Sequence, residues 1–353
     1  MIPFYFDNEG IIAYQKFVEQ CKSEKKNIVI LCDKNTEKYC LPLLESFALI
    51  PFIDHIISIP YGEKYKNIET VTFIWEQLLE NNADKNTILL SLGGGVICDL
   101  GGFVAATFKR GIESVYIPTS LIAQIDASIG GKTGFNLKHT KNQIGLFNYP
   151  NYNFIIPEFL KTLPEKEIWS GFIEMLKHGL IADKSYWERL IRIDNASQII
   201  DAELIKQSIK IKTDICKVDP YEKGERKKLN FGHTIGHALE ALSLETNQPL
   251  SHGEAVGMGI IVESYISVLK ELIDHQEFSS IFDVISCFTH VSIPQKINYD
   301  SFMIYLNKDK KKVGNAMNFT LLNSIGNAVI NQQVTYPEII SALDFLTKTK
   351  NQK

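Results

Sequence analysis

Three of the chain's eight histidines lie close together in the sequence. His233 and His237 are four residues apart in a segment whose apolar residues suit a helix, so both imidazoles are expected on one helix face. His252 follows a polar break and begins a second helical run, with Ser251 as its N-cap and Glu254 in its first turn. Imidazoles on two helices that meet would supply nitrogen ligands to a zinc ion, with a carboxylate or water completing its shell. The alternative is that all three are ordinary polar helix residues.

Charged residues on other helical segments favour chemistry with an anion. Glu174, Lys177 and His178 share one face of a predicted helix, among leucine, methionine and phenylalanine. An acid in such surroundings either pairs with its lysine or binds a metal, and the residues alone leave both interpretations open. Lys212, on a later amphipathic helix, and Arg226, just before the histidines, add positive charge that indicates a substrate bearing phosphate and carboxylate.

A glycine-rich turn at residues 93–102 (GGGVICDLGG) leads from a strand-like segment into a predicted helix. Glycines let the backbone approach a pyrophosphate closely, and the helix N-terminus offers N–H groups to the anion. The spacing is not a strict GxGxxG and does not follow the first strand, so a purely structural turn is the alternative. After an earlier strand, Asp33 and Asn35 either hydrogen-bond a ribose or nicotinamide or form an ordinary polar turn.

The segment 118–142 is unusually rich in small and polar residues. Lys132 follows two glycines, which favours its holding a phosphate or carboxylate as a point charge over a role as a solvated loop lysine. The segment also carries three further polar candidates, Asp126, Lys141 and Asn142. Near the end of the chain, the basic run at 308–312 (KDKKK) is typical of a solvated face, with a substrate role as the alternative.

The order of the elements predicts an α/β fold. Strand-like segments lie at residues 27–33, 53–60, 87–92 and 114–118, and helical periodicity lies at residues 67–80. This alternation predicts a parallel, doubly wound sheet, which binds nucleotides at the carboxyl ends of its strands. From about Pro157 the pattern is helical, and the later predicted elements are helices at 169–181, 202–217, 255–272 and 278–288, a hairpin around 325–326 and a helix at 337–347.

Composition narrows the class of protein. The 353 residues suffice for two domains, and 45% hydrophobic content is typical of a globular protein. The 37 basic and 41 acidic residues are spread along the chain, so no general affinity for nucleic acid is implied. The six cysteines lack a CxxC pair or framework spacing, which indicates reduced, buried thiols. Without a secretory start or a run of about 18 apolar residues, we expect a cytoplasmic protein with no membrane span.

These patterns together predict an NAD- and metal-dependent enzyme that acts on a polyhydroxy acid phosphate. A metal that polarises an alcohol beside a nicotinamide ring is a sensible arrangement for hydride removal. We therefore predict an NAD-binding α/β domain over residues 1–156 and a mainly helical metal- and substrate-binding domain over residues 157–353.

Seven motifs resemble those of the 3-dehydroquinate synthase family, which acts second in the shikimate pathway. They are GGGVICDLGGF (93–103), KRG (109–111), PTSLIAQIDASIGGKTGFN (118–136), KNQIGLF (141–147), ExxKHG (174–179), LNFGHTIGHALE (229–240) and SHGEAVGMG (251–259). The resemblance extends from about Asp33 to Lys311 in the same order, and it implies the same fold.

The resemblance implies roles for individual residues. Glu174, His233 and His252 would bind the metal, usually zinc, with cobalt possible. His237, which the spacing alone offers as a zinc ligand, becomes a substrate-contacting or proton-handling residue. The other implied substrate contacts are Asp126, Lys132, Asn142, Lys177, Lys212, Arg226, Asn230 and a lysine of the basic run, Lys310. The implied NAD-binding positions are Asp33, Asn35, Glu63, Lys66, Gly94, Gly95, Asp99, Thr119, Ser120, Lys141 and Thr162.

The implied reaction converts 3-deoxy-D-arabino-heptulosonate 7-phosphate to 3-dehydroquinate and phosphate. It proceeds by transient oxidation with NAD, β-elimination of phosphate, reduction and an intramolecular aldol closure, so NAD is regenerated in each turnover. Arg110 matches a family arginine that reaches the phosphate of a neighbouring subunit, which implies a homodimer. The chain departs from the family pattern after Asp219, at Thr140 and at Ser120, which puts local loop geometry in doubt.

Three rival functions share parts of this pattern. A related sugar-phosphate cyclase would act on sedoheptulose 7-phosphate or glucose 6-phosphate, which lack the carboxylate that Lys212 and Arg226 suit. An alcohol dehydrogenase of the glycerol or iron-dependent kind would accumulate NADH. A non-catalytic NAD- and zinc-binding sensor would release no phosphate.

Overall fold

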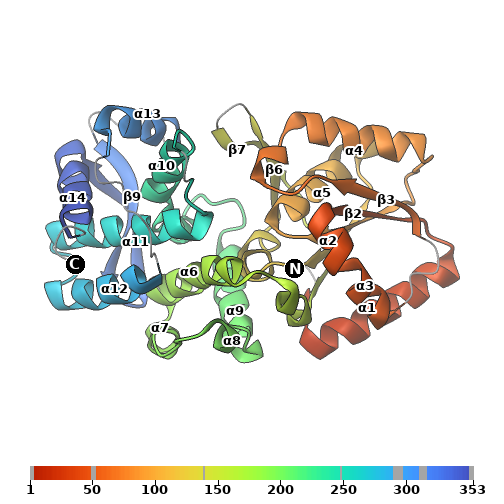
Figure 1. Cartoon of the computed structure of the whole chain (residues 1–353), viewed down its shortest axis with the longest axis horizontal. Coiled ribbons are helices and arrows are strands. Elements are labelled where there is room, and N and C mark those ends of the chain that lie inside the picture. Colours follow the sequence, from red (N-terminus) through yellow and green to blue (C-terminus); the bar gives the residue numbers. More distant parts are fainter. Residues whose placement is uncertain are drawn as a thin grey trace. The chain divides into compact units, whose positions relative to one another are not determined.

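The computed structural model describes residues 4–48, 53–137, 140–246, 249–288, 297–309 and 316–349. Its contacts divide the chain into two compact units. The N-terminal unit comprises Met1–Ile168 and Ile200–Ile209, and the C-terminal unit comprises Trp169–Ile199 and Lys210–Lys353 (Figure 1). Our placement of a domain boundary between residues 156 and 157 stays a prediction.

The N-terminal unit contains a six-stranded parallel sheet. Its strand order is β1-β8-β5-β4-β2-β3. The strands are β1 (Phe4–Phe6), β2 (Ile28–Asp33), β3 (Ile53–Ile59), β4 (Ile88–Gly93), β5 (Glu113–Pro118) and β8 (Tyr152–Ile155). The four predicted strands and the parallel sheet are confirmed. We missed β1 and β8, which have three and four residues and are too short for a periodic signal.

The sheet is covered on both faces, which explains why its strands are apolar throughout. In β2, Ile28 and Ile30 belong to one buried apolar cluster, whereas Val29 and Leu31 belong to another. The first cluster includes residues of α1 (Asp7–Glu24) and α3 (Leu41–Phe47), and the second includes residues of α4 (Ile68–Glu80) and α5 (Gly95–Thr107). Successive strand residues point to opposite faces, so the two clusters lie on the two faces of the sheet and helices cover both. This is the arrangement of a doubly wound sheet.

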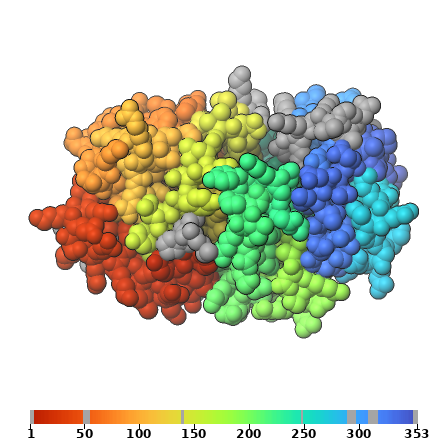
Figure 2. Space-filling model, turned by 180° about the vertical axis from the view of Figure 1, so that it is seen from behind, coloured from red at the N-terminus to blue at the C-terminus, as the bar shows by residue number. Residues whose placement is uncertain are grey.

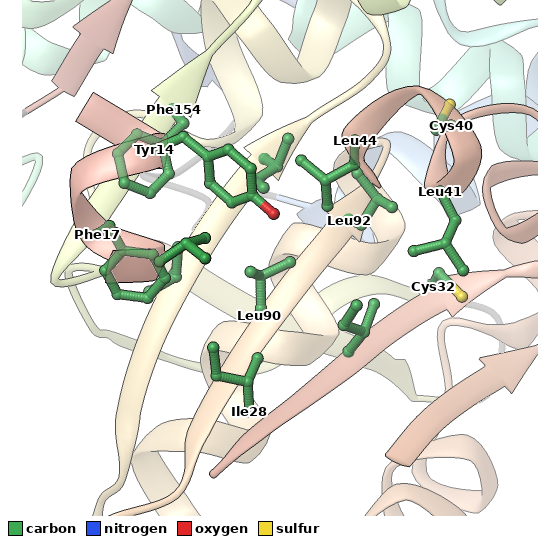
Figure 3. Close-up of a cluster of buried hydrophobic side chains, with 14 of the residues drawn as sticks. Tyr14, Phe17, Ile28, Cys32, Cys40, Leu41, Leu44, Leu90, Leu92 and Phe154 are labelled. Carbon is green, nitrogen blue, oxygen red and sulfur yellow. The ribbon is translucent and has the colours of Figure 1, made fainter. Parts of the chain in front are cut away.

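The first cluster shows how the helices pack on the sheet. Tyr14 and Phe17 reach from α1 toward Leu90 of β4, and Leu44 of α3 packs beside Leu92 (Figure 3). The opposite side of α1 is solvent-exposed, and its red atoms form part of the outer surface in Figure 2. The core therefore fixes the strand ends that carry the glycine turn and Asp33.

An antiparallel hairpin of β6 (Lys132–Leu137) and β7 (Thr140–Phe147) follows β5 and was not predicted. Gly134 pairs with Gly145 across it, and a Cβ added at Gly134 would lie 2.3 Å from the carbonyl oxygen of Ile144. The high content of small and polar residues did not indicate strands. Because glycine has no side chain, the two strands can pair closely here.

From residue 165 onward the chain is mainly helical, as predicted. The helices are α6 (Glu165–Ala182), α7 (Lys184–Leu190), α8 (Ala196–Ile199), α9 (Ala202–Val218), α10 (His233–Ser243), α11 (His252–Leu269), α12 (His275–Phe288), α13 (Tyr299–Asp309) and α14 (Tyr336–Thr349). The predicted hairpin is formed by β9 (Ala316–Ser324) and β10 (Asn327–Thr335). Within the described ranges, no helix is both long and apolar enough to span a bilayer.

The cysteines are unpaired thiols, as predicted. Five are buried, but Cys287 is exposed, so the prediction of burial is wrong there. Cys287 lies in the last turn of α12, where its Sγ lies 3.1 Å from the carbonyl oxygen of Asp283.

Candidate active site

Three helices of the C-terminal unit bring a carboxylate and two imidazoles together. Glu174 lies on α6, His233 is the first residue of α10, and His252 is the first residue of α11. Glu174 Oε1 lies 3.4 Å from His233 Nε2 and 3.3 Å from His252 Nε2. One potential ligand atom from each residue lies within 4.8 Å of the other two. This is the donor set of a zinc site with three protein ligands.

The carboxylate of Glu174 has the character of a metal ligand. Its side chain is 1% exposed, and Lys177 Nζ lies 2.6 Å from Oε2. This contact is an ion pair, and neither carboxylate oxygen forms a hydrogen bond with any described residue. Buried carboxylate oxygens normally have hydrogen-bond partners or bind a metal, so these residues fit a divalent cation.

The three ionisable groups influence one another strongly. Burial, the largest single influence, would raise the pKa of Glu174, but Lys177 and the two imidazoles hold it well below its usual range. Burial, assisted by the charge of Lys177, lowers the pKa of His233 to about 4. Burial also acts to lower the pKa of His252, but the carboxylates of Glu174 and Glu240 outweigh it and raise this pKa to about 9.

A buried carboxylate fixes the start of α10 against α11. Glu263, on α11, is fully buried and accepts hydrogen bonds from the backbone N–H groups of Gly232 (2.7 Å) and Ile235 (3.1 Å). It therefore caps α10 from a neighbouring helix. The two helices touch at Gly259, where an added Cβ would lie 1.8 Å from the carbonyl oxygen of Gly232. The position of His233 thus depends on α11.

Local sequence fixes the start of α11. Ser251 accepts a hydrogen bond from the backbone N–H of Glu254, and the Glu254 carboxylate accepts one from the Ser251 N–H, which confirms the predicted N-cap. The Gly253 N–H donates to Ser170 Oγ of α6 at 3.0 Å. His252 is therefore held by its own helix cap and by the helix that carries Glu174.

The other candidates of the C-terminal unit lie mainly on α6, on α9 and on the turn η5 (Glu225–Asn230). The ring of His237 lies 5.2 Å from that of His233 and 6.1 Å from that of His252, measured between centroids. Lys177, Lys212 and Arg226 are buried. Lysine and arginine are rarely buried unless they are paired, so these three are not ordinary solvated surface cations.

The chain departs from the family pattern at Pro220 and Tyr221, in a loop that Asp219 holds. Asp219 accepts hydrogen bonds from the backbone N–H groups of Lys223, Gly224 and Arg226, and thereby organises the loop before η5. Arg226 Nη1 also donates to the carbonyl oxygen of Pro220 at 2.6 Å. Asn230 Nδ2 donates to Glu222 Oε1 at 2.6 Å. Lys310 lies outside the described residues.

In the N-terminal unit, the glycine turn joins β4 to α5. Gly94 is the N-cap of α5, and no side chain in the described part of the chain caps this helix. The Thr119 N–H donates to the carbonyl oxygen of Gly93 at 3.0 Å, which ties the ends of β4 and β5 together. A Cβ at Gly94 would lie 3.3 Å from Ser120 Oγ, and one at Gly95 would lie 3.2 Å from the Cβ of Ala127. Because these glycines have no side chain, Ser120 and Ala127 can pack close to this strand edge.

Asp33 has a local structural role. Its carboxylate accepts hydrogen bonds from the backbone N–H groups of Asn35 and Thr36, both at 2.9 Å, and so caps α2 (Lys34–Tyr39). The polar-turn interpretation is therefore correct for the contacts present, and a contact with NAD stays a prediction. Thr162 Oγ1 donates to the carbonyl oxygen of Phe159 at 2.8 Å and lies 3.6 Å from Cys40 Sγ.

A buried lysine joins several predicted positions of the N-terminal unit. Lys66 Nζ lies 2.5 Å from both Asp99 Oδ2 and Asn142 Oδ1. Burial raises the pKa of Asp99 even though Lys66 acts to lower it. Glu63 Oε1 lies 3.9 Å from Lys141 Nζ and accepts a hydrogen bond from Asn136 Nδ2 at 2.8 Å. The predicted residues in this group are thus brought together.

Asn136 was not singled out from the sequence, although it belongs to this network. Its Oδ1 accepts a hydrogen bond from the backbone N–H of Asn142 at 2.9 Å. Three further candidates lie on short elements of this unit. Asp126 lies in the π-helical turn η3 (Ala123–Ala127), Lys132 begins β6 and is exposed, and Arg110 closes η2 (Phe108–Arg110) with a φ of 65°.

Solved structures share this fold. A 2-deoxy-scyllo-inosose synthase complexed with carbaglucose-6-phosphate, NAD+ and Co2+ superposes with a TM-score of 0.84 at 23% identity, covering 97% of this chain and 96% of that one. A 2-epi-5-epi-valiolone synthase from Streptomyces hygroscopicus subsp. jinggangensis 5008 with NAD+ and Zn2+ bound gives 0.84 at 23% identity, covering 99% and 97%. At this identity the likeness establishes the fold alone, which dehydrogenases share. A glycerol dehydrogenase from Schizosaccharomyces pombe gives a TM-score of 0.68 at 15% identity, covering 99% of this chain and 90% of that one.

Sequence comparison identifies the family to which the chain belongs. Residues 56–170 match the model of the 3-dehydroquinate synthase N-terminal region, and residues 171–312 match that of its C-terminal region. A 3-dehydroquinate synthase from Parabacteroides distasonis is 40% identical over 336 residues, which cover 94% of each chain. The chain belongs to the 3-dehydroquinate synthase family, as its motifs predicted.

Proposed function

We propose that this protein is a 3-dehydroquinate synthase, a lyase that converts 3-deoxy-D-arabino-heptulosonate 7-phosphate to 3-dehydroquinate and phosphate. The observation that carries the proposal is the convergence of Glu174, His233 and His252 in a chain that the family models match from residue 56 to residue 312. The 40% identity to a named synthase over 94% of both chains supports the same reaction.

The cofactors follow from the residues present. Glu174, His233 and His252 would hold zinc or cobalt, and the glycine turn would receive NAD. When bound, the metal supplies a Lewis acid at the hydroxyl to be oxidised, and NAD supplies a hydride acceptor that is regenerated in the same turnover. The buried, incompletely hydrogen-bonded oxygens of Glu174 support the first assignment, and the uncapped start of α5 supports the second.

The cations of the C-terminal unit would bind and orient the substrate. Lys177, Lys212 and Arg226 are at most 7% exposed, so their fields are less screened by water than those of surface lysines. Arginine suits the planar carboxylate, and lysine suits phosphate as a point charge. We infer that these residues distinguish an acid phosphate from sugar phosphates that lack a carboxylate.

Proton transfer would use His237 and the substrate itself. His237 lies beside both metal-binding imidazoles without belonging to the set of three ligands, so it suits a proton-handling role near the reacting carbon. Glu174 serves the metal and Glu240 lies against His252, so neither is a good candidate for the base. We infer that the phosphate of the substrate accepts the proton as it leaves.

Arg110 would reach the phosphate bound by a second copy of the chain, which makes the protein a homodimer. The assembly and the cytoplasmic location stay predictions.

The direct test is turnover by the purified protein. With 3-deoxy-D-arabino-heptulosonate 7-phosphate, zinc and a catalytic amount of NAD, we expect phosphate and 3-dehydroquinate in equal amounts, with no net rise in absorbance at the NADH band. NADH accumulating with the substrate would instead identify an oxidoreductase. Preferred turnover of sedoheptulose 7-phosphate or glucose 6-phosphate would identify another cyclase, and binding of NAD and zinc without phosphate release would identify a sensor.

A further inference from the structure

We propose that Glu240 is a positioning residue for the metal ligand His252, holding Nδ1 of its imidazole so that Nε2 faces the metal. This inference rests on the metal site of the proposed function and adds a residue that is not itself a ligand. Glu240 lies on α10, whereas His252 begins α11, so the contact also joins the two helices that carry the histidine ligands.

The imidazole of His252 lies between two carboxylates. Its Nε2 lies 3.3 Å from Glu174 Oε1, and its Nδ1 lies 3.6 Å from Glu240 Oε2. The second distance is longer than a hydrogen bond, and it places a carboxylate oxygen, which can only accept, next to that nitrogen. A histidine that binds a metal does so as the neutral imidazole, which carries one N–H and one lone pair. A proton held at Nδ1 by Glu240 leaves the lone pair at Nε2, on the side of Glu174.

His233 shows the same arrangement with a different acceptor. Its Nδ1 lies 3.2 Å from the carbonyl oxygen of Phe231, and its Nε2 lies 3.4 Å from Glu174 Oε1. Both histidines thus present Nε2 to one carboxylate oxygen while an oxygen acceptor lies at Nδ1. Such outer acceptors set the tautomer and the orientation of metal-binding histidines. The repeated pattern indicates that the Glu240 contact has this purpose.

The location of Glu240 suits this task. It is seven residues after His233 on α10, which places it two turns along nearly the same helix face. Glu240 is 7% exposed, so its carboxylate is largely shielded from water. The close approach of α10 and α11 at Gly259 keeps the two helices from sliding apart. Glu240 can therefore hold the His252 ring in one orientation.

The test measures zinc affinity of the full-length protein by competition with a chelator, together with the absorption spectrum of the cobalt form. We expect Glu240→Gln to weaken zinc binding by about 10–100-fold and to change the visible cobalt bands. Glu245→Gln is the matched control, because Glu245 is exposed near the end of α10 and accepts a hydrogen bond from Tyr305. We expect the control to bind zinc as the wild type does.

A second variant pair separates positioning from general damage. In a His252→Cys background, which keeps a third metal ligand but has no Nδ1, Glu240→Gln should cause no further loss of zinc affinity. Glu240→Asp keeps a carboxylate and should retain more affinity than Glu240→Gln. Thermal unfolding of the metal-free proteins shows whether each variant is folded.

The outcomes distinguish this inference from the proposed function. If the wild type binds zinc and Glu240→Gln binds it equally well, with an unchanged cobalt spectrum, Glu240 has no positioning role while the proposed function stands. An equal loss in the His252→Cys background would also overturn the inference, because the effect would not act through the imidazole of His252. If the wild type itself binds no zinc, the metal assignment of the proposed function fails, and the inference fails with it.

Discussion

Each unit of the chain contains a carboxylate beside a buried lysine, yet the two pairs differ in character. The side chain of Asp99 is 18% exposed, whereas that of Glu174 is 1% exposed. In the N-terminal unit, Lys66 lies 2.5 Å from both Asp99 and Asn142, so its ammonium group is shared between two acceptors. In the C-terminal unit, Lys177 lies 2.6 Å from Glu174, which also faces two imidazoles.

The pKa shifts of the two carboxyl groups go in opposite directions. Burial is the largest influence on both, and it raises the pKa of Asp99 in spite of Lys66. At Glu174 the same influence is outweighed by Lys177 and the imidazoles, so the pKa falls well below its usual range. A lysine alone makes an ion pair. A lysine together with two imidazoles keeps the Glu174 carboxylate ionised, which is the form that binds a metal ion.

Glu174→Ala removes the carboxylate on which the metal cluster converges and should have the largest effect. We expect turnover to fall by at least about 10³-fold and bound zinc to be lost with it, because two imidazoles alone leave a weak site. Turnover and metal content measured on the same preparation check this. Glu165→Ala, at an exposed position on α6, is the control and should retain both. A Glu174→Ala protein that keeps its zinc would show that the ion lies elsewhere.

Lys66→Met tests the other half of the comparison and should change stability rather than metal content. Without the cation, the pKa of Asp99 rises further, because only burial remains dominant. A raised carboxyl pKa in the folded state makes the ionised form costly, so the loss of stability should grow as the pH rises above about 4, the ordinary value for aspartate. We expect the free energy of unfolding to fall by about 1–3 kcal/mol at pH 8 and by less at pH 5.

Urea unfolding of Lys66→Met at the two pH values measures this difference. Lys34→Met removes an exposed lysine that pairs with Glu37, and should change stability little at either pH. An equal loss at pH 5 and pH 8 would mean that Asp99 does not ionise as proposed. Loss of zinc from Lys66→Met would contradict the expectation that this lysine affects stability and not metal content.

Much of the fold was readable from the sequence because its signals are local. The apolar runs that became β2 and β4 are continuous, since both faces of the sheet are buried. The Ser251 cap located the start of α11 to the residue, whereas the interval between His233 and His237 indicated the helix α10 without its bounds. The hairpin of β6 and β7 was missed because glycine pairing across strands leaves no periodic pattern.

The contacts that complete the site were not readable in the same way. Glu263 caps α10 from a position 31 residues beyond Gly232, and Glu240 meets His252 across a gap between helices. Lys66 reaches Asn142 over 76 residues of sequence. Residue types and spacing give no sign of such partners, because the partners depend on how helices pack. The motifs of the family supplied Glu174 as the third ligand, which spacing alone left undecided.

Ser251→Ala should have the smallest effect, and it separates local from long-range control of the metal cluster. Its side chain caps α11 directly before His252, and loss of such a cap costs about 1 kcal/mol of stability. Asn67→Ala is the matched control, since Asn67 caps α4 in the N-terminal unit by accepting from the Thr70 N–H at 2.9 Å. Both variants should lose a similar free energy of unfolding in urea. Only Ser251→Ala should weaken zinc binding, by about 2–5-fold, because the lost cap loosens the first turn of α11, which carries the metal ligand His252. Equal zinc affinity in the two variants would show that Glu240 and Ser170 hold His252 without help from the cap.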